Sequence, residues 1–473
     1  MLGKIRNIHF VGIGGIGMSG IAEVMLNLGF AVSGSDLKRS AVTDRLARLG
    51  ARVSEGHEAG NVRGAQVVVV SSAVARDNPE IAAAQRWQIP VVPRAEMLAE
   101  LMRLKFSVAV AGAHGKTTVT SMIALMLALA GLDPTAVIGG RLDAFGSSAR
   151  LGKGELMVVE ADESDHSFLH LFPTIAVVTN IDLEHLEHYR DIGEIVSAFV
   201  SFMGKVPFYG AVVLCVDPVS APTEVPLGTL LPRLSRRAIT YGLEPGAEVT
   251  AVHCEIGSLG SQFEVTAQGR SLGSVTLHVP GRHNVQNALA AAAVGLELDV
   301  SADAIRKGLE SFRGADRRFQ VRAESNGITV VDDYGHHPTE IRATLEAARA
   351  RGAKRIWVIF QPHRYTRTKF LMDDFAHSFE GCERVYVLDI YPASELPIPG
   401  VSAQRLVGRM RELGFDRAQY VSDEDAIAEV LEKARPGDLI MTIGAGNISR
   451  VAERLANRLD GDAGTRSVRG QDS

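Results

Sequence analysis

The chain of 473 residues has little cysteine and few aromatic side chains, which make up only 6% of it. Its three cysteines, Cys215, Cys254 and Cys382, are far apart in the sequence. They lack the paired spacing of a zinc site or of a disulfide framework. This usage is typical of a reducing compartment, and we expect a cytoplasmic protein.

Long uncharged apolar runs are also missing from the sequence. The longest candidate, SMIALMLALAGL, has only about a dozen residues, whereas a membrane-spanning helix needs about 20. Glycines interrupt the apolar N-terminal segment IRNIHFVGIGGIG, which argues against a signal peptide. The sequence therefore predicts no membrane partner.

Neither sign of charge is in large excess, since 50 basic and 55 acidic residues give a formal net charge of -5. Such a chain has no global attraction to a polyanion, so nucleic acid is not an expected partner. Hydrophobic residues make up 46% and charged residues 22%, as in ordinary globular proteins. The length favours two to four domains over a single core, and we predict three.

Short apolar runs alternate with helical stretches along the chain, which predicts an α/β fold with largely parallel sheets. The first predicted domain, residues 1–105, is Rossmann-like. The second, residues 106–314, is of the P-loop ATPase type. Its mostly parallel sheet has an antiparallel addition at about 249–279, where apolar and polar residues alternate. The third, residues 315–473, is again Rossmann-like.

A glycine-rich motif follows the first predicted strand directly. Gly12, Gly14 and Gly17 open a helix, and Asp36 stands about twenty residues further on, as in the dinucleotide-binding fingerprint. Alone, the motif indicates an NAD-dependent oxidoreductase, or a turn that merely packs a helix on a strand. Its physical content is narrower, because exposed amides at a helix start attract any pyrophosphate. No evident hydride-transfer site follows, and we therefore assign the loop to a nucleotide substrate's diphosphate.

A second phosphate-binding motif, GAHGKTT, lies between a buried strand and a helix. Backbone amides there would cradle phosphates, Lys116 would meet the β/γ-phosphate oxygens, and the Thr117 hydroxyl would bind Mg²⁺. Val110 replaces the first glycine of the long P-loop pattern. The predicted nucleotide-binding residues of this loop are Gly112, Ala113, His114, Gly115, Lys116, Thr117 and Thr118.

Two polar clusters follow later strands, EADE at 160–163 and DLEH at 182–185. Ligands of open α/β sheets bind at the carboxyl ends of strands, so both clusters are candidates to face the phosphate loop. We predict that Thr117, Glu160 and His185 bind Mg²⁺, with Mn²⁺ as the other candidate ion. The alternative is a pair of solvated strand ends with surface carboxylates.

Six ordered motifs span most of the chain: GAHGKTT, EADESD, TNIDLEH, GRHNVQNAL, DDYGHHPTE and FQPHRYTRT. Together they resemble the Mur ligase family, and within it the enzymes that join L-alanine to UDP-N-acetylmuramate. The resemblance implies domains that bind, in order, a UDP-sugar, ATP and an amino acid. It also implies ATP-dependent amide-bond formation through an acyl phosphate, releasing ADP and phosphate, in peptidoglycan precursor synthesis. We expect a monomer or a weak homo-oligomer.

The resemblance also implies residue roles. The residues expected at the UDP-sugar are Gly14, Gly15, Ile16, Gly17, Asp36 and Ser71. Those expected at ATP, besides the phosphate loop, are Asn284, Asn287, Arg317, Arg318 and Asp332, with Asp333 as the alternative to Asp332. Those expected at the amino acid are Tyr334, His336, His363, Arg364 and Arg367. Those expected to act in catalysis are Lys116, His185, His336, Arg364 and Arg367.

The match has departures, and rival functions stay open. Ala113 and Val119 stand where the family has threonine, Glu184 and Glu187 where it has aspartate, and Asn447 where aspartate is common. The first rival is the related ligase that attaches a recycled peptide to the same sugar nucleotide. The others are the oxidoreductase and a catalytically silent nucleotide-binding regulator.

Overall fold

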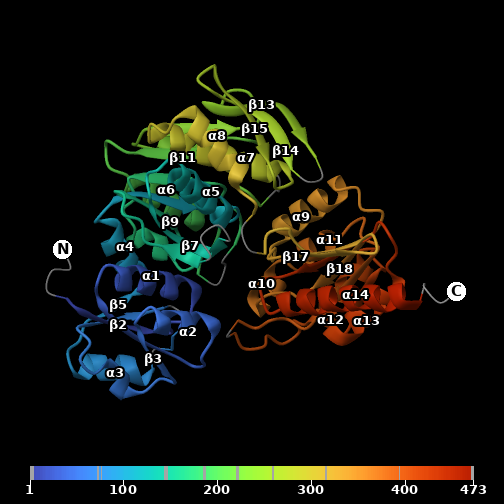
Figure 1. Cartoon of the computed structure of the whole chain (residues 1–473), viewed down its shortest axis with the longest axis horizontal. Coiled ribbons are helices and arrows are strands. Elements are labelled where there is room, and N and C mark those ends of the chain that lie inside the picture. The colour runs from blue at the N-terminus through green and yellow to red at the C-terminus, as the bar shows by residue number, and fades with distance from the viewer. Residues whose placement is uncertain are drawn as a thin grey trace.

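The computed structural model describes residues 5–71, 74–75, 77–142, 147–184, 188–219, 223–257, 260–314, 317–393 and 395–469. Within them the chain forms three sheets in three lobes (Figure 1). The predicted three-unit α/β architecture is confirmed. The domain limits 1–105, 106–314 and 315–473 remain predictions, although each sheet draws all its strands from one of these units.

The N-terminal sheet is parallel throughout, in the order β3-β2-β1-β4-β5. Its strands are β1 (Asn7–Val11), β2 (Ala31–Asp36), β3 (Arg52–Glu55), β4 (Val67–Val70) and β5 (Val91–Pro93). One face packs against α1 (Ile16–Asn27), α2 (Ala41–Arg48) and α4 (Arg94–Met102), and the other against η1 (Ala59–Val62) and α3 (Pro79–Arg86). The strand order reverses between β1 and β4, and doubly wound sheets bind ligands at such a switch point.

The central sheet has ten strands among the described residues, in the order β15-β14-β13-β12-β11-β10-β6-β9-β7-β8. They are β6 (Phe106–Ala111), β7 (Thr135–Leu142), β8 (Ser147–Arg150), β9 (Leu156–Glu160), β10 (Ile175–Val178), β11 (Ala211–Cys215), β12 (Ala238–Gly242), β13 (Val249–Ile256), β14 (Ser261–Ala267) and β15 (Arg270–Leu277). Pairing is parallel from β7 to β13, whereas β8, β14 and β15 join antiparallel. The predicted antiparallel addition is thus confirmed.

Helices cover both faces of the central sheet. Strand β6 alternates strictly, with Val108 and Val110 facing one apolar core and Ala109 and Ala111 the other. The first core includes α5 (Lys116–Leu129), α7 (Arg282–Glu297) and α8 (Ala302–Ser311). The second includes α6 (Ile192–Gly204) with the 3-10 turns η2 (Ser167–His170) and η3 (Leu227–Arg233), and it continues into the N-terminal unit.

The C-terminal sheet has the order β16-β17-β21-β18-β19-β20, with only β16 antiparallel to its neighbour. Its strands are β16 (Gln320–Ser325), β17 (Ile328–Asp333), β18 (Ile356–Phe360), β19 (Arg384–Val387), β20 (Ala418–Tyr420) and β21 (Leu439–Ile443). One face packs against α9 (Pro338–Ala350), α11 (Met372–His377) and α12 (Ala403–Glu412), and α10 (Tyr365–Phe370) follows β18. The other face packs against α13 (Asp423–Lys433) and α14 (Ser449–Arg469).

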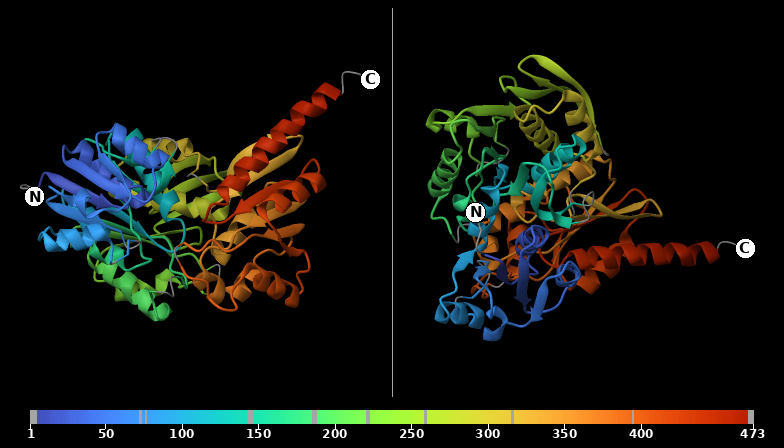
Figure 2. Two further views of the ribbon diagram at one scale, coloured as in Figure 1. Left: turned by 90° about the horizontal axis from the view of Figure 1, so that it is seen from below. Right: turned by 60° about the vertical axis from the view of Figure 1, so that its left-hand side comes forward.

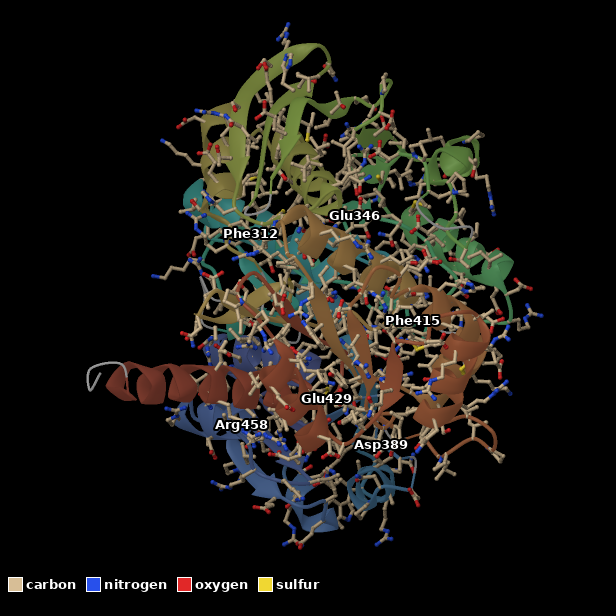
Figure 3. The ribbon with its side chains drawn as sticks, turned by 90° about the vertical axis from the view of Figure 1, so that its right-hand side faces the viewer. Phe312, Glu346, Asp389, Phe415, Glu429 and Arg458 are labelled. Carbon is tan, nitrogen blue, oxygen red and sulfur yellow. The ribbon has the colours of Figure 1, made fainter. Side chains whose placement is uncertain are left out.

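Figure 3 labels one residue on each of three covering helices, Glu346 on α9, Glu429 on α13 and Arg458 on α14. Helix α14 extends beyond the body of the C-terminal lobe (Figure 2). Among the described residues, no helix combines the length and apolar character needed to cross a membrane.

Candidate active site

The phosphate loop, residues 112–115, connects β6 to α5. Gly112 has a φ of 141° and Gly115 a φ of 83°, backbone conformations that favour glycine. A Cβ on Gly112 would collide with Thr179, and one on Gly115 would lie 2.7 Å from the amide oxygen of Asn287. The backbone of His114 donates to the Asn180 side chain at 2.8 Å. The loop is therefore packed too closely for larger residues at either glycine.

Lys116, the first residue of α5, lies under this loop. Its Nζ donates to the Gly112 carbonyl at 2.6 Å and to Glu163 Oε1 at 2.6 Å. Burial disfavours the ammonium, but the adjacent Glu163 carboxylate outweighs it and raises the pKa of Lys116 above its ordinary value. The side chain is therefore a fixed positive charge where the motif predicts phosphates.

Two of the three predicted metal ligands come together beside the loop. The Thr117 hydroxyl donates to Glu160 Oε1 at 3.2 Å, and the Gly139 amide donates to Glu160 Oε2 at 2.7 Å. Burial raises the pKa of Glu160, against the opposing charge of Lys116. Oxygen ligands suit Mg²⁺, and a cation would compensate this buried carboxylate, so the residues present fit the ion. His185, the third predicted ligand, lies outside the described residues.

Two of the residues expected at ATP lie at the start of α7. Asn287 donates to Asn284 Oδ1 at 3.2 Å, and Asn284 donates to the Pro280 carbonyl at 2.7 Å. The contact of Asn287 with Gly115 places this helix start against the phosphate loop. Their contact with ATP remains a prediction.

The residues predicted for the UDP-sugar gather at the switch point of the N-terminal sheet. The Gly14 amide donates to Asp36 Oδ2 at 2.8 Å, so the end of β2 is held against the glycine turn after β1. Ser71 directly follows β4, the strand paired with β1 on its other side. The residues of this group are Gly14, Gly15, Ile16, Gly17, Asp36 and Ser71. The side chain of Ile16 is outside the described part of the chain.

Arg94, the first residue of α4, was not among the residues predicted from the sequence. Its guanidinium lies 3.2 Å from Asp162 Oδ2, and a Cβ on Gly17 would lie 2.8 Å from Arg94 Nη1. Arg94 also lines a small recess together with Glu160 and Asp162. A cation thus stands between the N-terminal glycine turn and the predicted metal ligands. Only tertiary structure brings it there, since the local sequence PRAE carries no phosphate-binding signal.

The amino-acid cluster, defined as Tyr334, His336, His363, Arg364 and Arg367, forms at the carboxyl ends of β17 and β18. The ring centroids of Tyr334 and His336 are 5.4 Å apart, and those of His336 and His363 are 5.8 Å apart. Arg367 Nη1 lies 3.2 Å from His363 Nδ1. Tyr391, which was not predicted, stacks on His363 at 5.6 Å.

Both imidazoles of the amino-acid cluster are neutral at physiological pH. Burial, with the charge of Arg367, lowers the pKa of His336 to about 3 despite the nearby Glu340. Burial, with the neighbouring His336 and the arginines, lowers the pKa of His363 to about 2. The cluster therefore combines guanidinium cations with uncharged imidazoles that can accept a hydrogen bond.

The remaining predicted nucleotide residues lie at one edge of the C-terminal sheet, where β16 begins and β17 ends. Arg317 donates to Asp332 Oδ2 at 3.1 Å and to the Gly444 carbonyl at 2.6 Å, and its guanidinium lies 5.0 Å from the Tyr334 ring. Arg318 donates to Glu340 at 3.1 Å. Asp332 has no exposed surface, so its nearest partners are within the protein. Contact of Arg317, Arg318 and Asp332 with a nucleotide remains a prediction.

Family comparison covers all three units. Residues 7–106 match "Mur ligase family, catalytic domain", residues 110–295 match "Mur ligase middle domain", and residues 317–446 match "Mur ligase, glutamate ligase domain". The chain belongs to the Mur ligase family. The resemblance inferred from the six motifs is thus confirmed.

Individual Mur ligases are similar to this chain over nearly its whole length. The UDP-N-acetylmuramate--L-alanine ligase of Solibacter usitatus is 55% identical over 461 residues, 97% of this chain and 96% of that protein. The ligase of the same name from Geobacter sulfurreducens is 52% identical over 463 residues, 97% of this chain and 99% of that protein.

Two solved Mur ligase structures share the three-domain fold. The UDP-N-acetylmuramate-alanine ligase MurC of Thermotoga maritima superposes with a TM-score of 0.80 at 29% identity, covering 97% of this chain and 100% of that one. The murein peptide ligase mpl of Psychrobacter arcticus gives a TM-score of 0.72 at 25% identity, covering 96% of this chain and 98% of that one.

Proposed function

We propose that this chain joins L-alanine to the carboxylate of UDP-N-acetylmuramate, with cleavage of ATP to ADP and phosphate, in peptidoglycan precursor synthesis. The observation that carries the proposal is identity of 52% to 55% with enzymes of that name over at least 97% of the chain. The geometry supports it, because the phosphate loop and the amino-acid cluster lie on facing units.

The first step joins two anions. An oxygen of the substrate carboxylate attacks the γ-phosphorus of ATP, the bond to the β,γ-bridging oxygen breaks, and ADP leaves. Lys116 at the phosphate loop would neutralise charge on the transferring group, and Arg94 would face the diphosphate of the sugar nucleotide. Thr117 and Glu160 would hold Mg²⁺, or Mn²⁺, which supplies further charge neutralisation when bound.

In the second step the alanine nitrogen attacks the acyl carbon, the amide bond forms and phosphate leaves with the bonding electrons. The guanidinium groups of Arg364 and Arg367 would grip the alanine carboxylate through forked hydrogen bonds. The neutral imidazole of His336 would accept a hydrogen bond from the amine, which must lose protons to form an amide. Its Nδ1 donates to the Tyr334 carbonyl, which leaves the lone pair on Nε2, and an imidazolium would have none.

The test is phosphate release by the purified full-length chain with Mg²⁺, ATP and UDP-N-acetylmuramate. We expect release only when L-alanine is added, with a mass increase of the sugar nucleotide equal to one alanine residue. Release with a murein tripeptide but not with alanine would assign the chain to the recycling reaction instead. Binding of NAD(H) without binding of the UDP-sugar would favour the oxidoreductase.

Serine and glycine belong in the same assay. One methyl group is worth only about 1–3 kcal/mol of discrimination, so we expect limited exclusion of glycine. A cytoplasmic location and a monomeric or weakly oligomeric state belong to the proposal as well. The free state of Cys215, Cys254 and Cys382 is consistent with a reducing compartment.

A further inference from the structure

The side chain of His114 leaves the phosphate loop and lies between carboxylates of two different units. Its Nε2 is 3.1 Å from Asp182 Oδ2, which follows β10 of the central sheet. Its Nδ1 is 3.6 Å from Glu340 Oε1, on α9 of the C-terminal unit. The imidazole is 14% exposed, Asp182 is fully buried and Glu340 is 7% exposed. The motif places His114 at a nucleotide, yet its ring contacts the other unit.

Two further side chains of the C-terminal unit reach the same aspartate. The Thr339 hydroxyl donates to Asp182 Oδ2 at 2.9 Å, and His337 Nδ1 lies 3.5 Å from that oxygen. The rings of His114 and His337 are 5.1 Å apart. Asp182 is therefore the point on the central unit where the start of α9 docks.

Each end of this contact leads directly to residues assigned to substrates. On the central side, His114 is two residues before Lys116, and its carbonyl accepts from the Thr179 hydroxyl at 2.6 Å. On the other side, Glu340 Oε2 accepts from the backbone amide of His336 at 2.9 Å. A displacement of α9 from the central unit would thus change the positions of residues in both the phosphate loop and the amino-acid cluster.

The same neighbourhood includes a group of possible metal ligands, because donor atoms of His114, Glu184 and His337 lie within 4.8 Å of one another. A histidine binds a metal through a lone pair. Both ring nitrogens of His114 face carboxylates, which requires both to carry protons. Asp182 and Glu340 outweigh burial and raise the pKa of His114 to about 10. The geometry therefore favours an imidazolium salt bridge over a metal ligand.

We propose that His114 is a positioning residue that fastens the C-terminal unit to the phosphate loop, so that the amino-acid cluster meets the phosphates only in the docked state. The effect of this docking on catalysis depends on the proposed ligase function. The docking itself does not, since the contacts with Asp182 and Glu340 join residues of this chain.

The test compares His114→Asn and Thr339→Val, which remove the docking contacts from opposite units, with His377→Asn as the matched control. His377 is an exposed histidine on α11 whose Nδ1 lies 2.8 Å from the Asp373 carbonyl of its own helix. The readouts are kcat/KM for L-alanine and the Kd for ATP. A third readout is the radius of gyration, measured by small-angle X-ray scattering with a non-hydrolysable ATP analogue present.

We expect His114→Asn to lower kcat/KM for alanine more than about tenfold, because a buried charge pair loses one partner. Thr339→Val should lower it about fivefold, as for one hydrogen bond. Both variants should have a larger radius of gyration than the wild type, with the ATP Kd within about threefold and the control unchanged.

A compact His114→Asn variant with wild-type kcat/KM would overturn the proposal. So would an ATP Kd that weakens by the same factor as kcat/KM, because His114 would then serve the nucleotide directly. A stoichiometric metal that the substitution removes, measured by elemental analysis, would also overturn it. The scattering measurement needs no turnover, so it decides the docking role even if alanine-dependent phosphate release fails in the wild type.

Discussion

Two replacements of Arg364 can measure its backbone strain and its contribution to substrate binding separately. This residue precedes α10 with φ 70° and ψ 140°, a conformation that is readily available only to glycine. Its amide donates to the Tyr391 carbonyl at 2.8 Å, and its carbonyl accepts from the Thr368 hydroxyl at 2.8 Å, so the surrounding fold imposes the conformation. An arginine held in this conformation therefore indicates a functional demand on its side chain.

The comparison of Arg364→Gly with Arg364→Ala gives the size of the strain. Such strain costs about 1–3 kcal/mol, and glycine returns about 0.5–1 kcal/mol of it through greater freedom in the unfolded chain. Both variants lack the guanidinium, so they differ mainly at the backbone. We expect the glycine variant to have the higher free energy of unfolding by about 1 kcal/mol in urea titrations. A less stable glycine variant would refute the strain argument.

The same two variants test the grip on the alanine carboxylate. A hydrogen bond to a charged group is worth about 1.5–3 kcal/mol, so the KM for alanine should rise about tenfold to a hundredfold in both. The KM for ATP should change little. Lys369→Ala, which removes an exposed cation from the same helix, is the control. An equal rise in both KM values would remove the carboxylate assignment.

Three further predictions concern the central unit. Lys116→Met should fold normally by circular dichroism yet lose at least about a hundredfold of alanine-dependent phosphate release, and retained activity would contradict its assignment. Glu160→Gln should raise the Mg²⁺ concentration for half-maximal activity about tenfold, and an unchanged Mg²⁺ titration would exclude it as a ligand. The raised pKa of His114, about 10 against an ordinary 6.5, contributes stability that is complete below pH 6.5 and is lost as pH rises through 10. The difference in unfolding free energy between wild type and His114→Gln should thus fall by at most about 1.4 kcal/mol per pH unit between pH 7 and 10. A constant difference over this range would contradict the charged state of His114.

The parallel sheets and the local loop conformations could be predicted from the sequence. Strand β10 is a continuous apolar run and β6 is one apart from Ser107, and a run buried on both faces is typical of a helix-covered parallel sheet. The glycines of the phosphate loop are required by local backbone geometry, which a motif encodes directly. The residues that the resemblance assigns to the amino acid also lie together in space, because they follow two strands that end at the same sheet edge, while their role remains a prediction.

The order of the strands within each sheet could not be predicted from the sequence. The residues after β9 and β10 both reach the phosphate loop because these strands flank β6 on opposite sides. Nothing in their spacing specifies that neighbour relation. Arg94 and the contact between His114 and Glu340 were missed for a related reason, since each depends on how one unit packs against another. Motifs report local backbone needs and carry no information about packing between domains.

The pairing of cations and carboxylates at the site follows from the chemistry it must perform. Three of the candidate substrate-binding cations each pair with a carboxylate, Lys116 with Glu163, Arg94 with Asp162 and Arg317 with Asp332. These partners hold the cations in place. A phosphate or carboxylate that enters then exchanges one anionic partner for another, and this costs less than stripping water from a free ammonium or guanidinium. The three cations come from three units, so only a closed arrangement can apply all of them to the two anions that must react.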